Sequence, residues 1–145
     1  MSKKDGGFSD AERAAMQQRA EELRSTKGLK GAAKMARELE ACMKAIDALE
    51  GVDQQIAVRL NAIVAEEAPG LNPKTMYGFP AYAREGKVVV FFQPASKFGT
   101  RYGTIAFDDA ANLDDGPMWA TSFAVTEMTD DVVERIRALI KQAVS

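Results

Sequence analysis

One stretch in the middle of the chain decides the fold, and it reads Thr75-Met-Tyr-Gly-Phe-Pro-Ala-Tyr-Ala-Arg-Glu-Gly-Lys-Val-Val-Val-Phe-Phe-Gln93. This pattern predicts two β-strands joined by a tight connection at residues 84–87. The first strand contains Gly78 and Pro80, which normally mark an edge, a bulge or a close approach of the backbone. The second is a continuous β-branched and aromatic run, which is typical of a central strand covered on at least one face.

Amphipathic helices are expected on both sides of this stretch. Ser9 and Glu12 have the spacing of a capping box, and the helix that follows has a thin apolar face, so we expect it to be loosely docked or exposed. Asp53 is predicted to cap a helix and Thr129 another. The helices are expected at residues 9–24, 32–49, 53–68 and from 130 onward, with further strands at 101–107 and 121–125 and a loop at 108–117.

This order of elements indicates the α+β class. An antiparallel sheet of about four strands, packed by N-terminal helices and a C-terminal helix, would bury all the apolar stripes at once. Residues 1–31 are expected to form a flexible N-terminus with a helical extension, and residues 32–145 a single α+β domain.

The charge, cysteine content and hydrophobicity of the chain limit the partners and the cellular location that we expect. The chain has 145 residues with a net charge of −2, which argues against a nucleic-acid partner. It has one cysteine, Cys42, and we expect this residue to be a small buried hydrophobe in a reducing compartment. The sequence shows no signal peptide and no apolar run of about 20 residues, so we expect a cytoplasmic protein without a membrane partner.

The sequence contains no histidine. This excludes Ser-His-Asp and Cys-His catalysis and removes the commonest general base. No cofactor motif or nucleophile pair replaces it, so we do not expect an enzyme.

A pocket is one hypothesis for the aromatic segment. Tyr77, Gly78, Pro80 and Tyr82 could line a shallow pocket with tyrosine hydroxyl groups as polar contacts. The alternative is a bent edge strand whose tyrosines cover the rim of the core. Three further candidates for a binding site are Gln93 and Lys97 at a strand end and the single tryptophan, Trp119, and each could equally be a routine turn or core residue.

Four carboxylates, Asp108, Asp109, Asp114 and Asp115, gather in one loop. Carboxylates are the ligands that Ca²⁺, Mg²⁺, Mn²⁺ or Fe²⁺ would need. The alternative is a polar loop that ends a strand.

Four segments together resemble a known bacterial family: 77–82, 86–92, 96–98 and 119–123. The chain from about Ile46 to the C-terminus resembles the frataxin-like, YdhG-type group of bacterial iron chaperones, long described as a domain of unknown function. The resemblance implies a helix, an antiparallel sheet and a helix. It also implies weak iron binding through surface carboxylates and delivery of that iron to an accepting protein.

Two functions therefore stand as expectations. The first is iron binding and delivery by exposed carboxylates, with an iron-accepting protein as partner. The second is a binding module without catalytic activity, in which the tyrosine-lined pocket with Gln93, Lys97 and Trp119 holds a small anionic ligand or a peptide strand.

Overall fold

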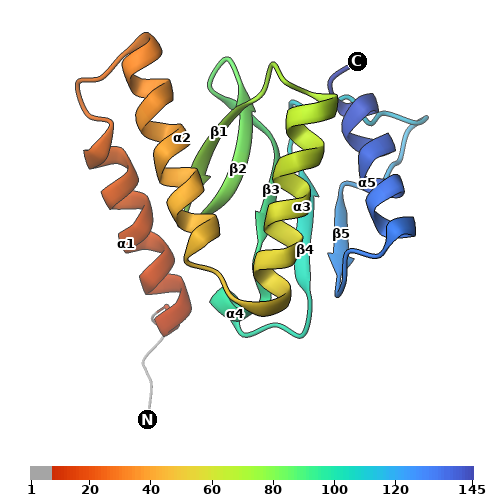
Figure 1. Cartoon of the computed structure of the whole chain (residues 1–145), viewed down its shortest axis with the longest axis horizontal. Helices are drawn as coiled ribbons and strands as arrows, with labels where there is room; N and C mark the ends of the chain where they lie inside the picture. The colour runs from red at the N-terminus through yellow and green to blue at the C-terminus, as the bar shows by residue number, and fades with distance from the viewer. Residues whose placement is uncertain (1–7) are drawn as a thin grey trace.

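The computed structural model describes residues 8–145, and Figure 1 shows their arrangement. The elements in chain order are α1 (Asp10–Ser25), α2 (Gly31–Asp47), α3 (Gly51–Glu67), β1 (Asn72–Met76), β2 (Phe79–Arg84), β3 (Lys87–Gln93), α4 (Ala95–Phe98), β4 (Gly103–Phe107), β5 (Ser122–Val125) and α5 (Asp130–Ala143). The predicted helices lie close to their expected bounds. The short helix α4, which was not predicted, follows the strand end at Gln93.

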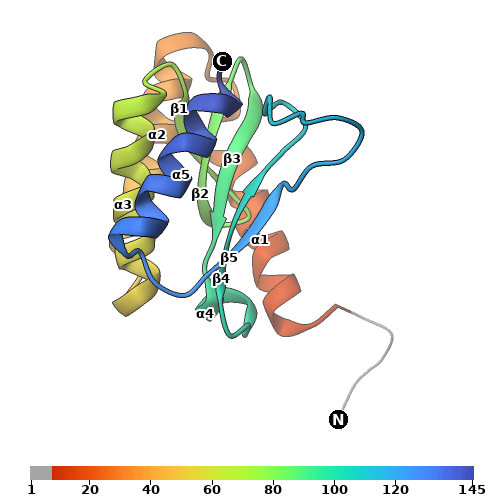
Figure 2. The ribbon, with the colours of Figure 1, turned by 90° about the vertical axis from the view of Figure 1, so that its right-hand side faces the viewer.

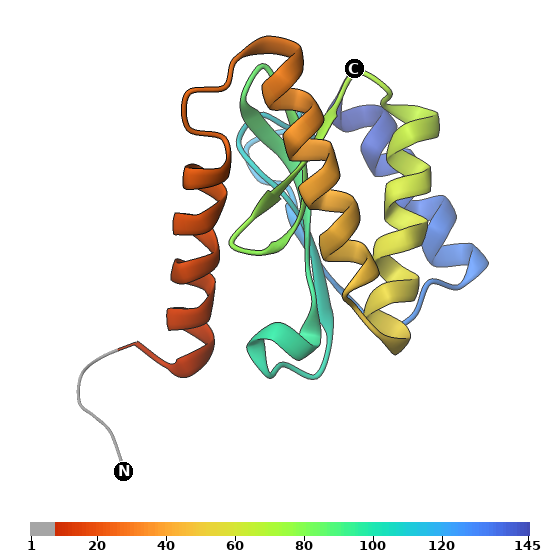
Figure 3. The same ribbon diagram turned by 60° about the vertical axis from the view of Figure 1, so that its left-hand side comes forward.

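The strands form one antiparallel sheet in the order β1-β2-β3-β4-β5. The predicted α+β class is confirmed, with five strands within residues 8–145 instead of about four. Helices α2, α3 and α5 cover one face of the sheet, as Figure 2 shows. Helix α1 lies outside this layer and contacts β1 and α4, and Figure 3 shows the β1–β2 hairpin between α1 and α2.

The aromatic segment forms a hairpin, so the prediction of one interrupted strand is wrong. Met76 pairs with Phe79, and the two residues between them, Tyr77 and Gly78, have φ values of 53° and 86°. Positive φ at both positions matches the twist that a two-residue hairpin needs, and glycine adopts it without strain. The glycine that was expected to interrupt a strand instead ends one strand and starts the next.

This hairpin places Pro80 in an inner strand, whereas the sequence favoured an edge. Pro80 pairs with Thr75 of β1, and the ladder between β2 and β3 begins one residue later, at Ala81 and Phe91. A proline is tolerated there because the ladder to β3 does not need its missing donor. The connection predicted at 84–87 is confirmed as a second two-residue turn, with φ of 52° at Glu85 and 80° at Gly86.

The core lies between the sheet and the layer of α2, α3 and α5. Its largest fully buried side chains include Tyr82, Phe92, Ile56, Leu60 and Ile105. Helix α1 buries none of its residues, as expected from its thin apolar face, and begins with the predicted capping box between Ser9 and Glu12. No helix within residues 8–145 combines the length and the apolar run needed to cross a membrane.

Packing between β3 and β4 gives a stability prediction. A Cβ on Gly103 would lie 2.7 Å from Cε1 of Phe92, whose side chain is fully buried and cannot move aside. Gly103→Ala should therefore lower the free energy of unfolding by about 1–3 kcal/mol, measured by urea denaturation. The matched control is Gly70→Ala, since a Cβ on Gly70 meets nothing within 4 Å. Equal effects of the two substitutions would contradict this account of the packing.

Candidate functional site

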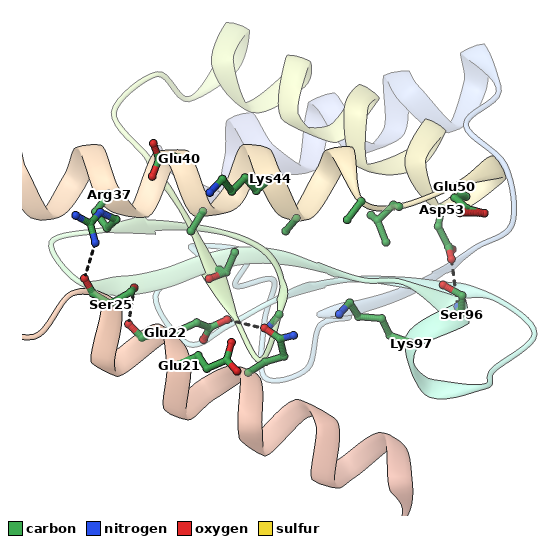
Figure 4. Close-up of a pocket in the computed structure, with 17 residues that line it drawn as sticks. Glu21, Glu22, Ser25, Arg37, Glu40, Lys44, Glu50, Asp53, Ser96 and Lys97 are labelled. Atoms are coloured by element: carbon green, nitrogen blue, oxygen red, sulfur yellow. Dashed lines mark hydrogen bonds between the residues drawn. The ribbon is translucent and has the colours of Figure 1, made fainter.

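A cavity of about 870 Å³ lies between α1 and α2 (Figure 4). Helices α1 and α2 form its long walls, and the β1–β2 hairpin and α4 close it. Its charged lining consists of Glu21, Glu22, Arg37, Lys44, Glu40, Glu50, Asp53 and Lys97.

One carboxylate joins α1 to the hairpin. The backbone N–H of Tyr77 donates to Oε1 of Glu22 at 3.1 Å, and the N–H of Gly78 donates to Oε2 at 2.7 Å. Nη1 of Arg19 lies 3.4 Å from Oε1 of the same carboxylate. The guanidinium carbon of Arg19 also lies 6.0 Å from the centre of the Tyr77 ring. These contacts fix the wall of the cavity that α1 supplies.

A second carboxylate positions α4. Asp53 was predicted to cap α3, but the N-cap residue is Glu50, and Asp53 lies in the first turn of the helix. Its two oxygens accept hydrogen bonds from the backbone N–H groups of Ala95 and Ser96, each at 3.2 Å. Helix α4 is thereby held against the start of α3, and Lys97 follows directly.

Two ammonium groups line the cavity without an ion pair to any other described residue. Lys44 comes from α2 and Lys97 from α4, and Figure 4 shows them on opposite sides of the cavity. Nζ of Lys97 lies 3.1 Å from the position that a Cβ on Gly78 would occupy, so this ammonium group sits against the tip of the hairpin. Arg37 donates to the carbonyl oxygen of Ser25 at 3.1 Å, which joins α2 to the end of α1.

The structure separates the residues that the sequence grouped into one pocket. Gly78 and Lys97 line the cavity between α1 and α2. Tyr77 and Gln93 line a second hollow of about 410 Å³, with Met16 and the rings of Phe79, Phe91 and Phe98. Trp119 belongs to the loop between β4 and β5 and lines neither hollow.

Pro80 and Tyr82 are core residues, so the expectation that both tyrosines line one pocket is not met. Both side chains are fully buried. The hydroxyl of Tyr82 donates to Oδ1 of Asn61 at 3.0 Å and lies beside the thiol of Cys42. Burial raises the pKa of the Cys42 thiol to about 11 and also raises the pKa of Tyr82.

The acidic loop does not form a grouped ligand set. Within residues 8–145, no three His, Cys, Asp or Glu side chains are placed together to hold a metal ion. Oδ1 of Asp108 accepts the backbone N–H of Asp109 at 2.9 Å, a local bond typical of a turn. The predicted metal site consisted of Asp108, Asp109, Asp114 and Asp115. The structure does not bring these four carboxylates together as a ligand set.

Sequence reasoning missed Glu22 and Lys44. Only one weak signal for α1 was present: its half-buried residues Ala11, Ala15, Arg19 and Glu22 recur every three or four positions. This stripe is small and polar, so a search for apolar periodicity does not find it.

No protein-family model, curated protein or solved structure matches this chain. The resemblance to the frataxin-like, YdhG-type group therefore stays a prediction.

The buried pair of Cys42 and Tyr82 predicts a loss of stability in alkali. An unfolded cysteine loses its proton near pH ~8.5, whereas the folded thiol keeps it up to about pH 11, so the folded state binds more protons in this window. The free energy of unfolding should fall as the pH rises through the window. Urea denaturation of Cys42→Ala should show a shallower fall, and a fall as steep as in the unsubstituted protein would contradict the assignment.

Proposed function

We propose that this chain is a binding module without catalytic activity that holds a small anionic molecule in the cavity between α1 and α2. The observation that carries the proposal is the pair of ammonium groups, Lys44 and Lys97, which line one cavity from opposite walls without an ion pair among residues 8–145. A ligand with an anionic group would supply the missing partner.

The size and lining of the cavity support this proposal. A volume of about 870 Å³ lies within the range of roughly 300–1,000 Å³ that is typical of small-molecule sites. Ala41 and Ala45 of α2, and Ala48 directly after this helix, line the wall between the charged groups and leave room for a ligand. The apolar part of this wall can bury the carbon skeleton of a small molecule.

The acidic side chains narrow the ligand class. Glu22 and Asp53 are already occupied by backbone N–H groups. Glu21, Glu40 and Glu50 also line the cavity, and their side chains make no hydrogen bond or ion pair with another described residue. They would repel a bare polyanion and accept hydrogen bonds from hydroxyl or amino groups. The ligand that fits best is therefore a small anion that also carries such donors, such as a hydroxy acid.

The lysine pair gives the test of this proposal. Malate, citrate and inorganic phosphate are titrated into the protein, and binding is followed by amide chemical shifts. Malate and citrate should shift the amides of Gly78, Ser96 and Lys97. The double substitution Lys44→Met and Lys97→Met should weaken binding about tenfold or more, because each charge-assisted hydrogen bond contributes ~1.5 kcal/mol or more.

The matched control is Lys87→Met, which removes one positive charge from an exposed residue outside the cavity. Binding should be unchanged in this variant. Equal weakening by Lys87→Met would indicate a general charge effect, and no shifts with any of the three anions would overturn the proposal.

No observation among residues 8–145 favours the iron-delivery role that the resemblance implies, because the carboxylates are not grouped as a ligand set. The location we propose is the cytoplasm, since the one cysteine of the sequence can form no internal disulfide.

The iron expectation has its own test. Fe²⁺ is titrated under anaerobic conditions by calorimetry into the protein and into a variant with Asp108, Asp109, Asp114 and Asp115 changed to Asn. The geometry predicts equal heats for the two proteins, because these carboxylates are not placed to act together. Saturable binding that is lost in the variant would support iron delivery and contradict this prediction.

A further inference from the structure

The tip of the β1–β2 hairpin presents two backbone donors to one carboxylate. The N–H groups of Tyr77 and Gly78 bind different oxygens of Glu22, at 3.1 and 2.7 Å. Both residues have positive φ and form the turn itself, outside the ladder that pairs β1 with β2. Two donors that engage the two oxygens of one carboxylate match a planar, two-pronged acceptor.

Two positively charged side chains lie near this pair of donors. Arg19 lies 3.4 Å from one oxygen of the bound carboxylate. The ammonium group of Lys97 lies against Gly78 and makes no ion pair among the described residues. Backbone donors and two cations at one point are the elements from which proteins build carboxylate sites.

The helix that supplies the carboxylate is weakly attached. Helix α1 buries no residue, and the side of it that is half buried consists of alanines and polar residues. Besides the Glu22 contact, the hydrogen bond from Arg37 to the carbonyl oxygen of Ser25 ties the end of α1 to α2. A segment with so little buried apolar surface opens at low free energy.

We infer that the amide pair of Tyr77 and Gly78, with Lys97, is a binding site for the carboxylate group of a small molecule, and that Glu22 occupies it in this structure as an internal competitor. The inference rests on the proposed function, whose cavity includes Gly78, Glu22 and Lys97. A ligand carboxylate replaces the Glu22 carboxylate and accepts the same two backbone hydrogen bonds. Helix α1, which is one wall of the cavity, is released from the hairpin in the same step.

A tethered competitor lowers the apparent affinity of the free ligand. The ligand binds only the fraction of molecules in which the site is vacant, so its apparent dissociation constant rises as that fraction falls. Removing the competing carboxylate should therefore strengthen binding of a simple carboxylate, although the substitution takes away a polar group of the cavity. A merely structural contact would give no such gain.

The experiment titrates succinate into the full chain and follows the backbone amide signals of Tyr77 and Gly78. Glu22→Ala should bind succinate about tenfold more tightly than the unsubstituted protein. Glu22→Gln, which keeps the size of the side chain but not its charge, should fall between the two. Succinamide, which has the same carbon skeleton without carboxylates, should not shift these two amides in any of the proteins.

Two controls are built into the chain. The second hairpin turn, Glu85 and Gly86, has nearly the same φ values (52° and 80°) but makes no bond to a carboxylate among the described residues, so its amides should not respond. Glu127→Ala removes one exposed carboxylate in the segment between β5 and α5, outside the cavity, and should leave succinate binding unchanged.

The outcomes separate this inference from the proposed function. No succinate-dependent shift at Tyr77 and Gly78 in either Glu22 variant, with both variants folded, overturns the inference. Shifts at Lys97 and Ser96 in that case would leave the proposed function standing. Tight succinate binding at the hairpin in Glu22→Ala, with no binding of malate or citrate by the unsubstituted protein, would support the inference and contradict the proposed function. Equal shifts at Glu85 and Gly86 would indicate unspecific binding to turn amides and would also overturn the inference.

Discussion

The two-residue turn at Tyr77 and Gly78 is the constraint on which the rest of the structure depends. Because the chain reverses there, β2 becomes an inner strand with β1 on one side and β3 on the other. The register that follows, with Tyr82 opposite Val90, places the Tyr82 ring in the core and its hydroxyl next to Asn61. The same reversal leaves two amides outside the ladder, where Glu22 binds them. The turn at Tyr77 and Gly78 thus sets both the position of Tyr82 in the core and the position of the two amides at the wall of the cavity.

The sequence predicted most of the fold, but it failed at the Tyr77-Gly78 pair, which was interpreted as part of one strand and is a hairpin turn. Apolar stripes located the helices, and the β-branched run located β3, since both patterns report burial directly. The segment 75–83 failed because tyrosine is not a usual first residue of a tight hairpin turn. A positive φ at a bulky residue is strained and persists only when tertiary contacts hold it. Here the Tyr77 amide bonds Glu22, a residue 55 positions away, and no local pattern reveals such a contact.

The candidate site was predicted in part, for a similar reason. Lys97 was identified because it lies at a strand end, where binding residues are common, and Gly78 because it lies between the two tyrosines of the aromatic segment. Glu22 and Lys44 were missed because their importance comes from what they face across the cavity. Charged residues on a helix normally mark its solvated side, and the sequence alone cannot distinguish that case from a polar contact between helices. Tyr82 was misplaced because its partner Asn61 lies in a helix that the sequence reads only as amphipathic.

The way in which α1 is attached makes an exchange of carboxylates energetically accessible. An apolar stripe would hold the helix in proportion to its buried area, at ~25 cal/mol per Å², and a polar ligand could not replace that contribution. Hydrogen bonds to a carboxylate contribute ~1.5–3 kcal/mol each, but an incoming carboxylate forms the same bonds, so their loss and gain nearly cancel. What remains to be overcome is the small set of other α1 contacts. Helix α1 has no buried residue, and the apparent dissociation constant of the ligand rises with the free energy needed to open these remaining contacts.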